Sequence, residues 1–224
     1  MRMPLVRVRD VKKTFGSGRA ARTVLDSAKI EIEAGEMVAI LGRSGSGKST
    51  LIHLIGGIDR PDSGSIEVAG LELSTLDERA LTEFRRDRVG FIFQLFHLSP
   101  ELTGVENVML PARVAGASQG APARGRELLD RLGLNGTADQ LPHTLSGGEQ
   151  QRIAIARALV NDATLILADE PSGSLDPVAG AQVLDILRSI AGGNRSVVLV
   201  THDVEAAARA DRVLELVDGR LRPR

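Results

Sequence analysis

The sequence predicts an α/β protein in which a mainly parallel sheet follows a small antiparallel sheet and is interrupted by a helical subdomain. Short, continuous apolar runs at 37–41, 165–168 and 197–200 are typical of strands that are buried on both faces of a parallel sheet. Alternating apolar residues near the start of the chain indicate half-exposed, antiparallel strands. Residues from about 98 to 160 show only helical patterns.

The antiparallel strands are expected first along the chain. Val6, Val8 and Val11 share one face of the first segment, with charged residues between them. In residues 24–33 apolar residues again occupy every second position, at Ala28 and beyond. This period of two brings one face of each strand to the core and leaves the other face in water.

Helices are expected between and after the buried strands. Their expected ranges are 49–55, 105–115, 123–132, 146–160 and 177–190. In the last helix Leu184 and Leu187 belong to one apolar stripe, as in helices that pack on a sheet. The chain is therefore expected to form one domain over residues 1–224. Its core would comprise residues 1–94 and 161–224, and its helical subdomain about 95–160.

The composition excludes several classes of protein. The 224 residues contain no cysteine, which excludes disulfides and thiolate metal sites. The net charge of −1 gives no sign of the basic surface that nucleic-acid binding requires, so no nucleic-acid partner is expected. No run reaches the roughly 18 apolar residues that would cross a bilayer, and the N-terminal stretch is too charged for a signal peptide. We therefore expect a soluble chain whose membrane role, if it has one, depends on a partner.

A phosphate-binding loop is the most specific motif in the chain. The segment GRSGSGKST lies between a buried strand and a helix and fits the pattern G-x-x-x-x-G-K-[ST]. Glycines let backbone N–H groups surround a polyphosphate, the lysine adds a positive charge, and the hydroxyl of Ser49 is placed to hold Mg²⁺. The expected nucleotide-binding residues of the loop are Gly42, Arg43, Ser44, Gly45, Ser46, Gly47, Lys48, Ser49 and Thr50.

Two carboxylates end a buried strand in the segment LILADE. Because a buried charge is costly, acids at this position indicate a function. Asp169 suits a Mg²⁺ ligand in a phosphate-loop enzyme, and Glu170 could polarise the water that attacks the γ-phosphate.

The segment LSGGEQ, at a predicted helix start, carries no base or nucleophile of its own. Ser146 and Glu149 fit the capping box S-x-x-E. The box does not explain Gly147 and Gly148, because glycine weakens a first helical turn. Since helix N-termini bind anions, the glycines suggest a phosphate close to the backbone. A second anion site without a base suggests that two chains meet head to tail, each closing the nucleotide site of the other.

Together, LSGGEQ, GRSGSGKST and LILADE resemble the ATP-binding cassette family, over almost the whole chain. The resemblance implies catalytic roles for Lys48, Glu170 and His202, which lies in VTHD. It also implies that Gln94, in FIFQ, contacts Mg²⁺ and water. Phe15 lies where the family usually has an aromatic residue that stacks on adenine. The residues that match the dimer-contact loop of the family are Ser174, Leu175 and Asp176.

One branch of the family is more similar still. GGIDRPDSG and GFIFQLFHLSPELTGVENVMLP resemble the lipoprotein-release and macrolide-export ATPases and their peptide-export relatives. The chain departs from that branch at Ser172, where threonine is usual in D-E-P-T-G-x-L-D. The hydroxyl remains, so hydrolysis is expected to survive.

The resemblance implies an ATPase subunit that dimerises around two ATP molecules with Mg²⁺ and drives a membrane permease. Such a subunit would lie on the cytoplasmic face of the cell membrane. We expect residues 95–110, with apolar Phe96, Leu98 and Leu102, to dock a cytoplasmic helix of the permease, although packing between lobes would use the same residues. Two alternatives stay open. One is a soluble cassette ATPase of iron–sulfur assembly, and the other is a regulatory cassette of the cell-division type, without transport.

Overall fold

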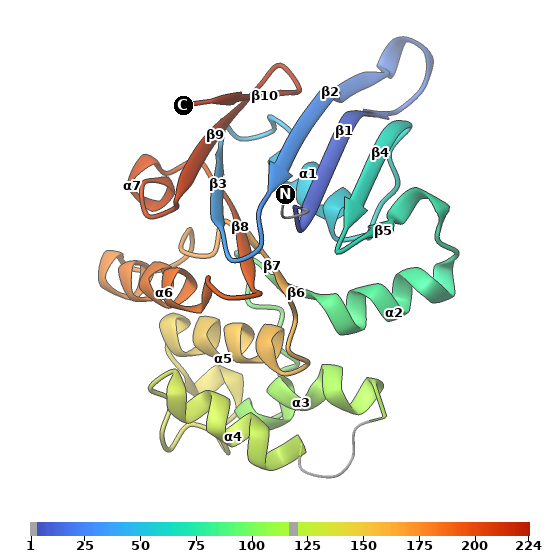
Figure 1. Ribbon diagram of the computed structural model, residues 1–224. Coiled ribbons are helices and arrows are strands. Elements are labelled where there is room, and N and C mark those ends of the chain that lie inside the picture. The colour runs from blue at the N-terminus through green and yellow to red at the C-terminus, as the bar shows by residue number, and fades with distance from the viewer. Residues whose placement is uncertain (1–3, 117–120) are drawn as a thin grey trace.

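The computed structural model describes residues 4–116 and 121–224 (Figure 1). Residues 1–3, part of the N-terminal stretch considered above, and residues 117–120 lie outside the described ranges. No helix in the described ranges is both long enough and apolar enough to cross a membrane.

A six-stranded sheet in the order β10-β9-β3-β8-β7-β6 forms the centre of the molecule. All neighbouring strands in it pair in parallel except β10, which runs antiparallel to β9. The mainly parallel sheet predicted from the continuous apolar runs is therefore confirmed. Its strands are β3 (Met37–Leu41), β6 (Val89–Ile92), β7 (Leu165–Asp169), β8 (Ser196–Thr201), β9 (Arg212–Val217) and β10 (Arg220–Pro223).

A smaller antiparallel sheet in the order β2-β1-β4-β5 lies beside the first, as the early alternating segments predict. The sequence did not single out the hairpin of β4 and β5, which extends this sheet beyond β1. In the described ranges its strands are β1 (Val6–Phe15), β2 (Arg22–Ile32), β4 (Ser63–Val68) and β5 (Leu71–Glu72).

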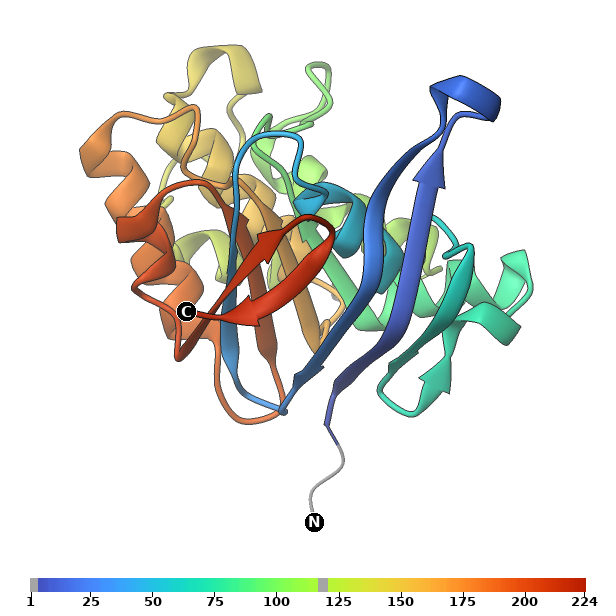
Figure 2. The same cartoon turned by 90° about the horizontal axis from the view of Figure 1, so that it is seen from above.

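Helices cover both faces of the six-stranded sheet. Helix α1 lies between the two sheets and contacts β4 of one and β7 and β8 of the other (Figure 2). On the opposite face α5 packs against β6 and α6, and α3 and α4 pack on α5. The described helices are α1 (Lys48–Ile55), α2 (Glu78–Arg88), α3 (Gly104–Val114), α4 (Ala121–Arg131), α5 (Gly147–Leu159), α6 (Pro177–Ile190) and α7 (Val204–Ala207). Short 3-10 turns are η1 (Gly18–Ala20), η2 (Leu73–Thr75) and η3 (Pro142–Thr144).

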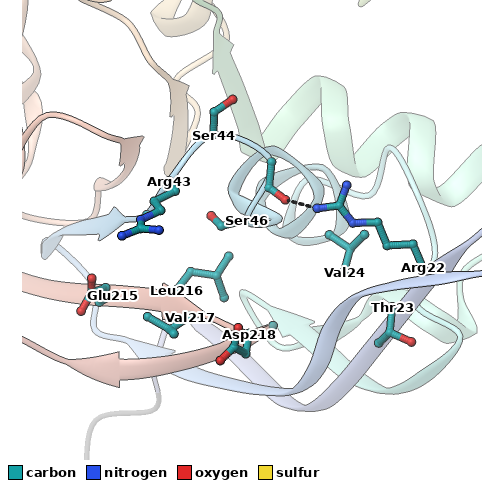
Figure 3. Close-up of a pocket in the computed structure, with 13 residues that line it drawn as sticks. Arg22, Thr23, Val24, Arg43, Ser44, Ser46, Glu215, Leu216, Val217 and Asp218 are labelled. Carbon is teal, nitrogen blue, oxygen red and sulfur yellow. Dashed lines mark hydrogen bonds between the residues drawn. The ribbon is translucent and has the colours of Figure 1, made fainter.

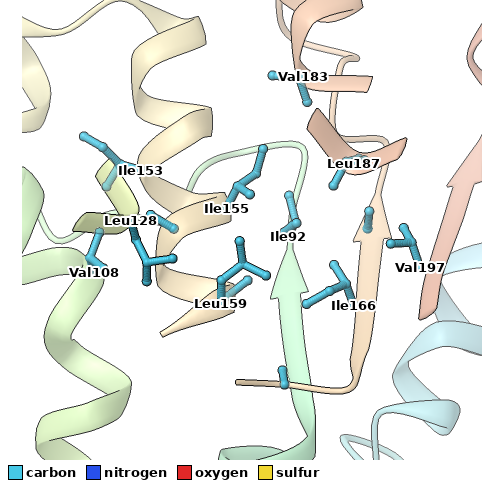
Figure 4. Close-up of a cluster of buried hydrophobic side chains, with 14 of the residues drawn as sticks. Ile92, Val108, Leu128, Ile153, Ile155, Leu159, Ile166, Val183, Leu187 and Val197 are labelled. Atoms are coloured by element: carbon cyan, nitrogen blue, oxygen red, sulfur yellow. The ribbon is translucent and has the colours of Figure 1, made fainter. Parts of the chain in front are cut away.

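The continuous apolar strands contribute side chains to two separate cores. Met37 and Leu41 of β3 pack with the helices of one face, whereas Val38 and Ile40 pack with α1 and the antiparallel sheet. Figure 4 shows the first core, where labelled side chains of α5 face those of β6 and β7. Burial on both faces explains why these strands lack alternation.

Asn107 is a buried polar residue that ties the loop before α3 to that helix. Its side chain is 0% exposed. Its Oδ1 accepts a hydrogen bond of 2.7 Å from the N–H of Ser99. Its Nδ2 donates to the carbonyl oxygens of Ser99, Leu102 and Thr103 at 3.1, 2.9 and 3.1 Å. This amide therefore satisfies the backbone of a loop that forms no ladder of its own.

We expect Asn107→Leu to lower the free energy of unfolding by about 1–3 kcal/mol, because a buried polar group left without a partner costs about that much. Urea denaturation followed by circular dichroism measures the change. Asn135→Leu, at an exposed asparagine, is the control and should change stability little. Equal stability of the two variants would contradict the role given to Asn107.

Candidate functional site

The carboxyl ends of β3, β7 and β8 meet at one edge of the parallel sheet, and a cavity of about 640 Å³ lies there. Ligands of open parallel sheets bind at this edge. Ten of the residues selected from the sequence line the cavity: Gly42, Arg43, Ser44, Gly45, Lys48, Ser49, Gln94, Asp169, Glu170 and His202.

Lys48 lies in the first turn of α1, with its ammonium group turned back over the loop. Its side chain is only 6% exposed. Its Nζ donates to the carbonyl oxygens of Gly42 and Arg43 at 2.9 and 3.1 Å, and lies 3.5 Å from Oε1 of Glu170. A buried charge requires such partners, and phosphate oxygens would replace them well.

The loop itself leaves little space for side chains. Gly47 has φ +105°, and a Cβ there would lie 2.7 Å from Cγ1 of Val24 and 2.9 Å from its carbonyl oxygen. The Oγ of Ser46 is buried and has no hydrogen-bond partner within the described ranges. A polar ligand in the loop would satisfy this hydroxyl.

The carboxylate of Glu170 is held by the end of β8. Its Oε1 lies 3.0 Å from Nδ1 of His202. Its Oε2 accepts hydrogen bonds from the hydroxyl of Thr201 at 3.1 Å and from the N–H of His202 at 3.3 Å. Glu170 has φ +46°, a left-handed conformation that L residues rarely adopt. Such strain is typical of functional positions, and Oε1 of this carboxylate lies 3.5 Å from Nζ of Lys48.

A second hollow of about 600 Å³ lies on the other side of the phosphate loop, against β2 and the β9–β10 hairpin (Figure 3). Arg22 donates to the carbonyl oxygen of Gly45 at 3.0 Å. Glu215 of β9 lines both cavities. Sequence reasoning missed Arg22 and Glu215, because a charged residue on an alternating strand is usually only a solvent-facing one.

Four other residues that the sequence predicts to bind the nucleotide do not line the main cavity: Phe15, Ser46, Gly47 and Thr50. Ser46 lines the second hollow, while Gly47 and Thr50 line neither. Phe15 is 46% exposed at the end of β1, where it pairs in register with Arg22. The Nζ of Lys13 lies 5.3 Å from the centroid of the Phe15 ring.

The segment 146–149 does not line the cavity of its own chain. The predicted capping box is present, because Ser146 N–H donates to Oε2 of Glu149 at 2.8 Å and Ser146 Oγ accepts from the N–H of Glu149 at 3.3 Å. The Ser146 hydroxyl, and then the Ser146 N–H, hold the pKa of the Glu149 carboxyl below its usual value.

The two glycines of this segment have close neighbours within the chain. A Cβ on Gly148 would lie 3.0 Å from Cβ of Ala179 in α6. A Cβ on Gly147 would lie 3.2 Å from Cδ2 of Leu175 and 3.5 Å from Cζ of Phe96. From the sequence, a nearby phosphate was the explanation given for both glycines. In the structure, close packing of α5 on α6 at Ala179 also explains why position 148 is a glycine.

Comparison with protein families decides the identity of this arrangement. A family model described as "ABC transporter" matches residues 25–173, more than half of the chain. The chain belongs to the ABC transporter family. This confirms the resemblance predicted from the three motifs.

Relatives of this ABC transporter chain include several export proteins. The macrolide export ATP-binding/permease protein MacB of Nitrosomonas europaea is 48% identical over 220 residues, which cover 97% of this chain and 33% of that protein. The probable syringafactin export ATP-binding/permease protein SyfD of Pseudomonas syringae is 46% identical over 222 residues, which cover 99% of this chain and 34% of that protein. The chain therefore spans about a third of the length of these curated relatives.

Solved structures of the family have the same fold. The dimeric ATP-binding cassette MJ0796, in a post-hydrolysis state bound to ADP and Pi, is 38% identical, with 96% of both chains covered and a TM-score of 0.86. A second dimeric structure of the same cassette gives the same values. The predicted phosphate-loop NTPase fold of this ABC transporter chain is thereby confirmed.

We expect Gly47→Ala to weaken ATP binding by about tenfold or more, because the new Cβ would collide with the backbone of Val24 and displace the loop. Titration with a fluorescent ATP analogue measures the affinity. Gly70→Ala is the matched control, since Gly70 also has positive φ, +80°, but no atom within 4 Å of the added Cβ. Equal affinities for the two variants would show that space around the loop does not matter.

Proposed function

We propose that this chain is the ATP-binding and ATP-hydrolysing cassette of an exporter, working as a dimer around two ATP molecules. The observation that carries the proposal is the joint placement of Lys48, Glu170 and His202 at one edge of the sheet. The names of the relatives favour export over the iron–sulfur assembly and regulatory alternatives.

ATP fits the residues that are present. The loop N–H groups and the N-terminus of α1 supply donors and a partial positive charge for the phosphates. Lys48 exchanges its carbonyl partners for phosphate oxygens, and the buried Ser46 hydroxyl gains a partner. Phe15 is proposed to stack on adenine, and its strand partner Arg22 holds the adjacent side of the loop.

Mg²⁺ fits the donor set at the same edge. Ser49, Gln94 and Asp169 all line the cavity, and each carries a side-chain oxygen. Mg²⁺ is usually held by one or two carboxylates together with phosphate oxygens and waters. When bound, the ion would neutralise charge that develops on the phosphates.

Glu170 is proposed as the general base. A base must be within reach of the attacking water, and the carboxylate lines the cavity beside Lys48. Two donors at the end of β8 fix its orientation, the Thr201 hydroxyl and the His202 N–H, and Nδ1 of the His202 ring lies 3.0 Å from its Oε1. His202 also lines the cavity and is proposed to stabilise charge on the transferred phosphoryl group.

The dimer would complete the site with the segment 146–149. Because Ser146, Gly147, Gly148 and Glu149 lie outside the cavity of their own chain, a second copy would bring its own segment over the nucleotide. The dimeric cassettes among the similar structures support this arrangement. The loop of Ser174, Leu175 and Asp176 is proposed to contact the second copy, and Ser174 Oγ donates to the carbonyl oxygen of Gln94 at 2.8 Å.

We expect Glu170→Gln to bind ATP and to abolish most of its hydrolysis, because the amide cannot accept the proton of the attacking water. The expected loss is about 10²–10⁴-fold in kcat, measured by phosphate release. Size-exclusion chromatography with ATP should show the variant trapped as a dimer. Glu83→Gln, at an exposed glutamate of α2, is the control. Hydrolysis at the parental rate would remove Glu170 from the mechanism.

The membrane partner is proposed to be a permease of the kind that the names of the relatives describe, so that the cassette lies on the cytoplasmic face of the cell membrane. We divide the chain into a core, residues 1–94 and 161–224, and a helical subdomain, about 95–160. A mainly apolar groove of about 560 Å³ lies between α2 and β6 on one side and α3 and α5 on the other. This groove is proposed to receive a cytoplasmic helix of the permease.

The residues that line this groove differ from the apolar residues that the sequence suggested for docking the permease. Leu98 packs against the core cluster of α3 and α5, and Phe96 lies close to Gly147. Neither lines the groove, nor does Leu102. Instead Phe91, Phe93 and His97 form a stack, with ring centroids 5.6 and 5.0 Å apart, and Leu110 and Val114 of α3 lie opposite.

We expect Val114→Asp to prevent co-purification of the cassette with its permease from membranes, because a carboxylate in an apolar interface loses its hydration. Val114 is 76% exposed, so the fold should survive. Leu71→Asp places the same charge on the edge strand β5, outside the groove, and should retain the permease. Retention of the permease by both variants would direct the search to another surface.

A further inference from the structure

Another cavity, lined by charged residues and separate from the two beside the phosphate loop, lies at the opposite edge of the parallel sheet. It has a volume of about 220 Å³ and is lined by Arg124 and Arg131 of α4, by Asp162 before β7 and by Arg195 before β8. Arg195 precedes β8 whereas His202 follows it, so about 20 Å of strand separates the two cavities. The arginine cavity therefore has no part in binding ATP.

Two of the arginines are fixed by the backbone. The Nε of Arg124 donates to the carbonyl oxygen of Val160 at 2.8 Å, and the Nε of Arg195 donates to that of Ala163 at 3.0 Å. The NH2 of Arg124 also donates to Oδ1 of Asp162, so Arg124 uses two of its N–H groups within the chain, whereas Arg195 uses one.

The positive charge around the cavity is only partly balanced. Oδ1 of Asp162 pairs with Arg124 and lies 3.9 Å from NH2 of Arg195. Within the described ranges Arg131 makes no hydrogen bond and no ion pair. Three guanidinium groups and one carboxylate leave a net charge of +2 at the cavity.

Burial disfavours the charged form of one of these arginines. It lowers the pKa of the Arg195 guanidinium, with Asp162 acting in the opposite direction and Arg131 and Arg124 adding their repulsion. Three positive groups around one small volume repel one another. An anion bound between them would be attracted to each of them and would offset this repulsion.

We propose that this cavity binds a phosphate-class anion, either free phosphate or the phosphoryl group of a lipid headgroup, between α4 and the turn before β8. The planar guanidinium fork matches phosphate oxygens, and three arginines line this cavity. Since one water occupies about 30 Å³, the cavity accommodates a phosphate with a few waters. The bound anion would bridge α4 to the start of the central strands.

Nuclear magnetic resonance of the ¹⁵N-labelled full chain, saturated with Mg²⁺ and ADP, tests the proposal by titration with inorganic phosphate at constant ionic strength. The amides of residues 128–132 and 192–196 should shift with saturation, whereas chloride should leave them in place. Shifts confined to residues 42–50 would show that phosphate binds only at the nucleotide loop, and would overturn the proposal without affecting the ATPase function.

Arg131→Gln is the decisive variant, because Arg131 contributes charge without holding the fold. It should weaken phosphate binding at the cavity by about tenfold or more. Arg222→Gln removes the same charge from exposed strand β10 and should bind phosphate as the parent does. Parental affinity in Arg131→Gln would also overturn the proposal.

Vesicle flotation distinguishes the two sources of phosphate. Binding to vesicles of phosphatidylglycerol and phosphatidylcholine, but not to phosphatidylcholine alone, with loss in Arg131→Gln, would identify a lipid headgroup. Phosphate binding without vesicle binding would identify a free phosphate compound. Failure to respond to either probe would leave the cavity without a ligand and refute the inference.

Discussion

The parallel pairing of β3 with β8, and of β8 with β7, is the constraint on which the site depends. The registers Leu41↔Thr201 and Asp169↔Val200 bring three chain segments to one edge of the sheet. Side chains separated by more than 120 positions then meet, as in the 3.5 Å contact of Lys48 with Glu170. Because these strands are buried on both faces, a slip of one residue would exchange the contents of two cores. The apolar packing therefore stabilises the register that brings Lys48, Glu170 and His202 together.

Charge is buried at this edge only where the fold supplies partners for it. The ammonium of Lys48 contacts loop carbonyl oxygens and Glu170. The carboxylate of Glu170 accepts hydrogen bonds from Thr201 and His202 at the end of β8. Groups fixed in this way need little reorganisation when a phosphate enters, which is how preorganised sites stabilise developing charge. The opposite edge differs, because in the described part of the chain only two of its three arginines, Arg124 and Arg195, lie within 4 Å of a carboxylate, that of Asp162. The sheet thus pairs Lys48 with Glu170 at one edge and carries an excess of positive charge at the other.

The motifs were predictable because each is a local pattern. GRSGSGKST specifies a turn, a helix start and a lysine within nine residues, and LILADE places its acids at a strand end by position alone. The segment 146–149 could be recognised as a capping box for the same reason. The edge strands β9 and β10 were not singled out, because short alternating runs resemble exposed loops. The docking segment 95–110 stays a prediction, since an apolar residue such as Leu98 can face either a core or a partner, and the chain pattern does not distinguish them.

By itself the sequence determined the nucleotide loop, the two acids, the helix cap and the α/β class, because backbone geometry and apolar periodicity over a few residues are sufficient for these. Only the tertiary structure decided that Ala179 lies against Gly148, that Arg22 and Glu215 border the loop, and that the three arginines share a cavity. The physical reason is that such contacts join segments through the order of the strands and the packing of helices on them. Neither the order nor the packing is encoded in the spacing of any one segment.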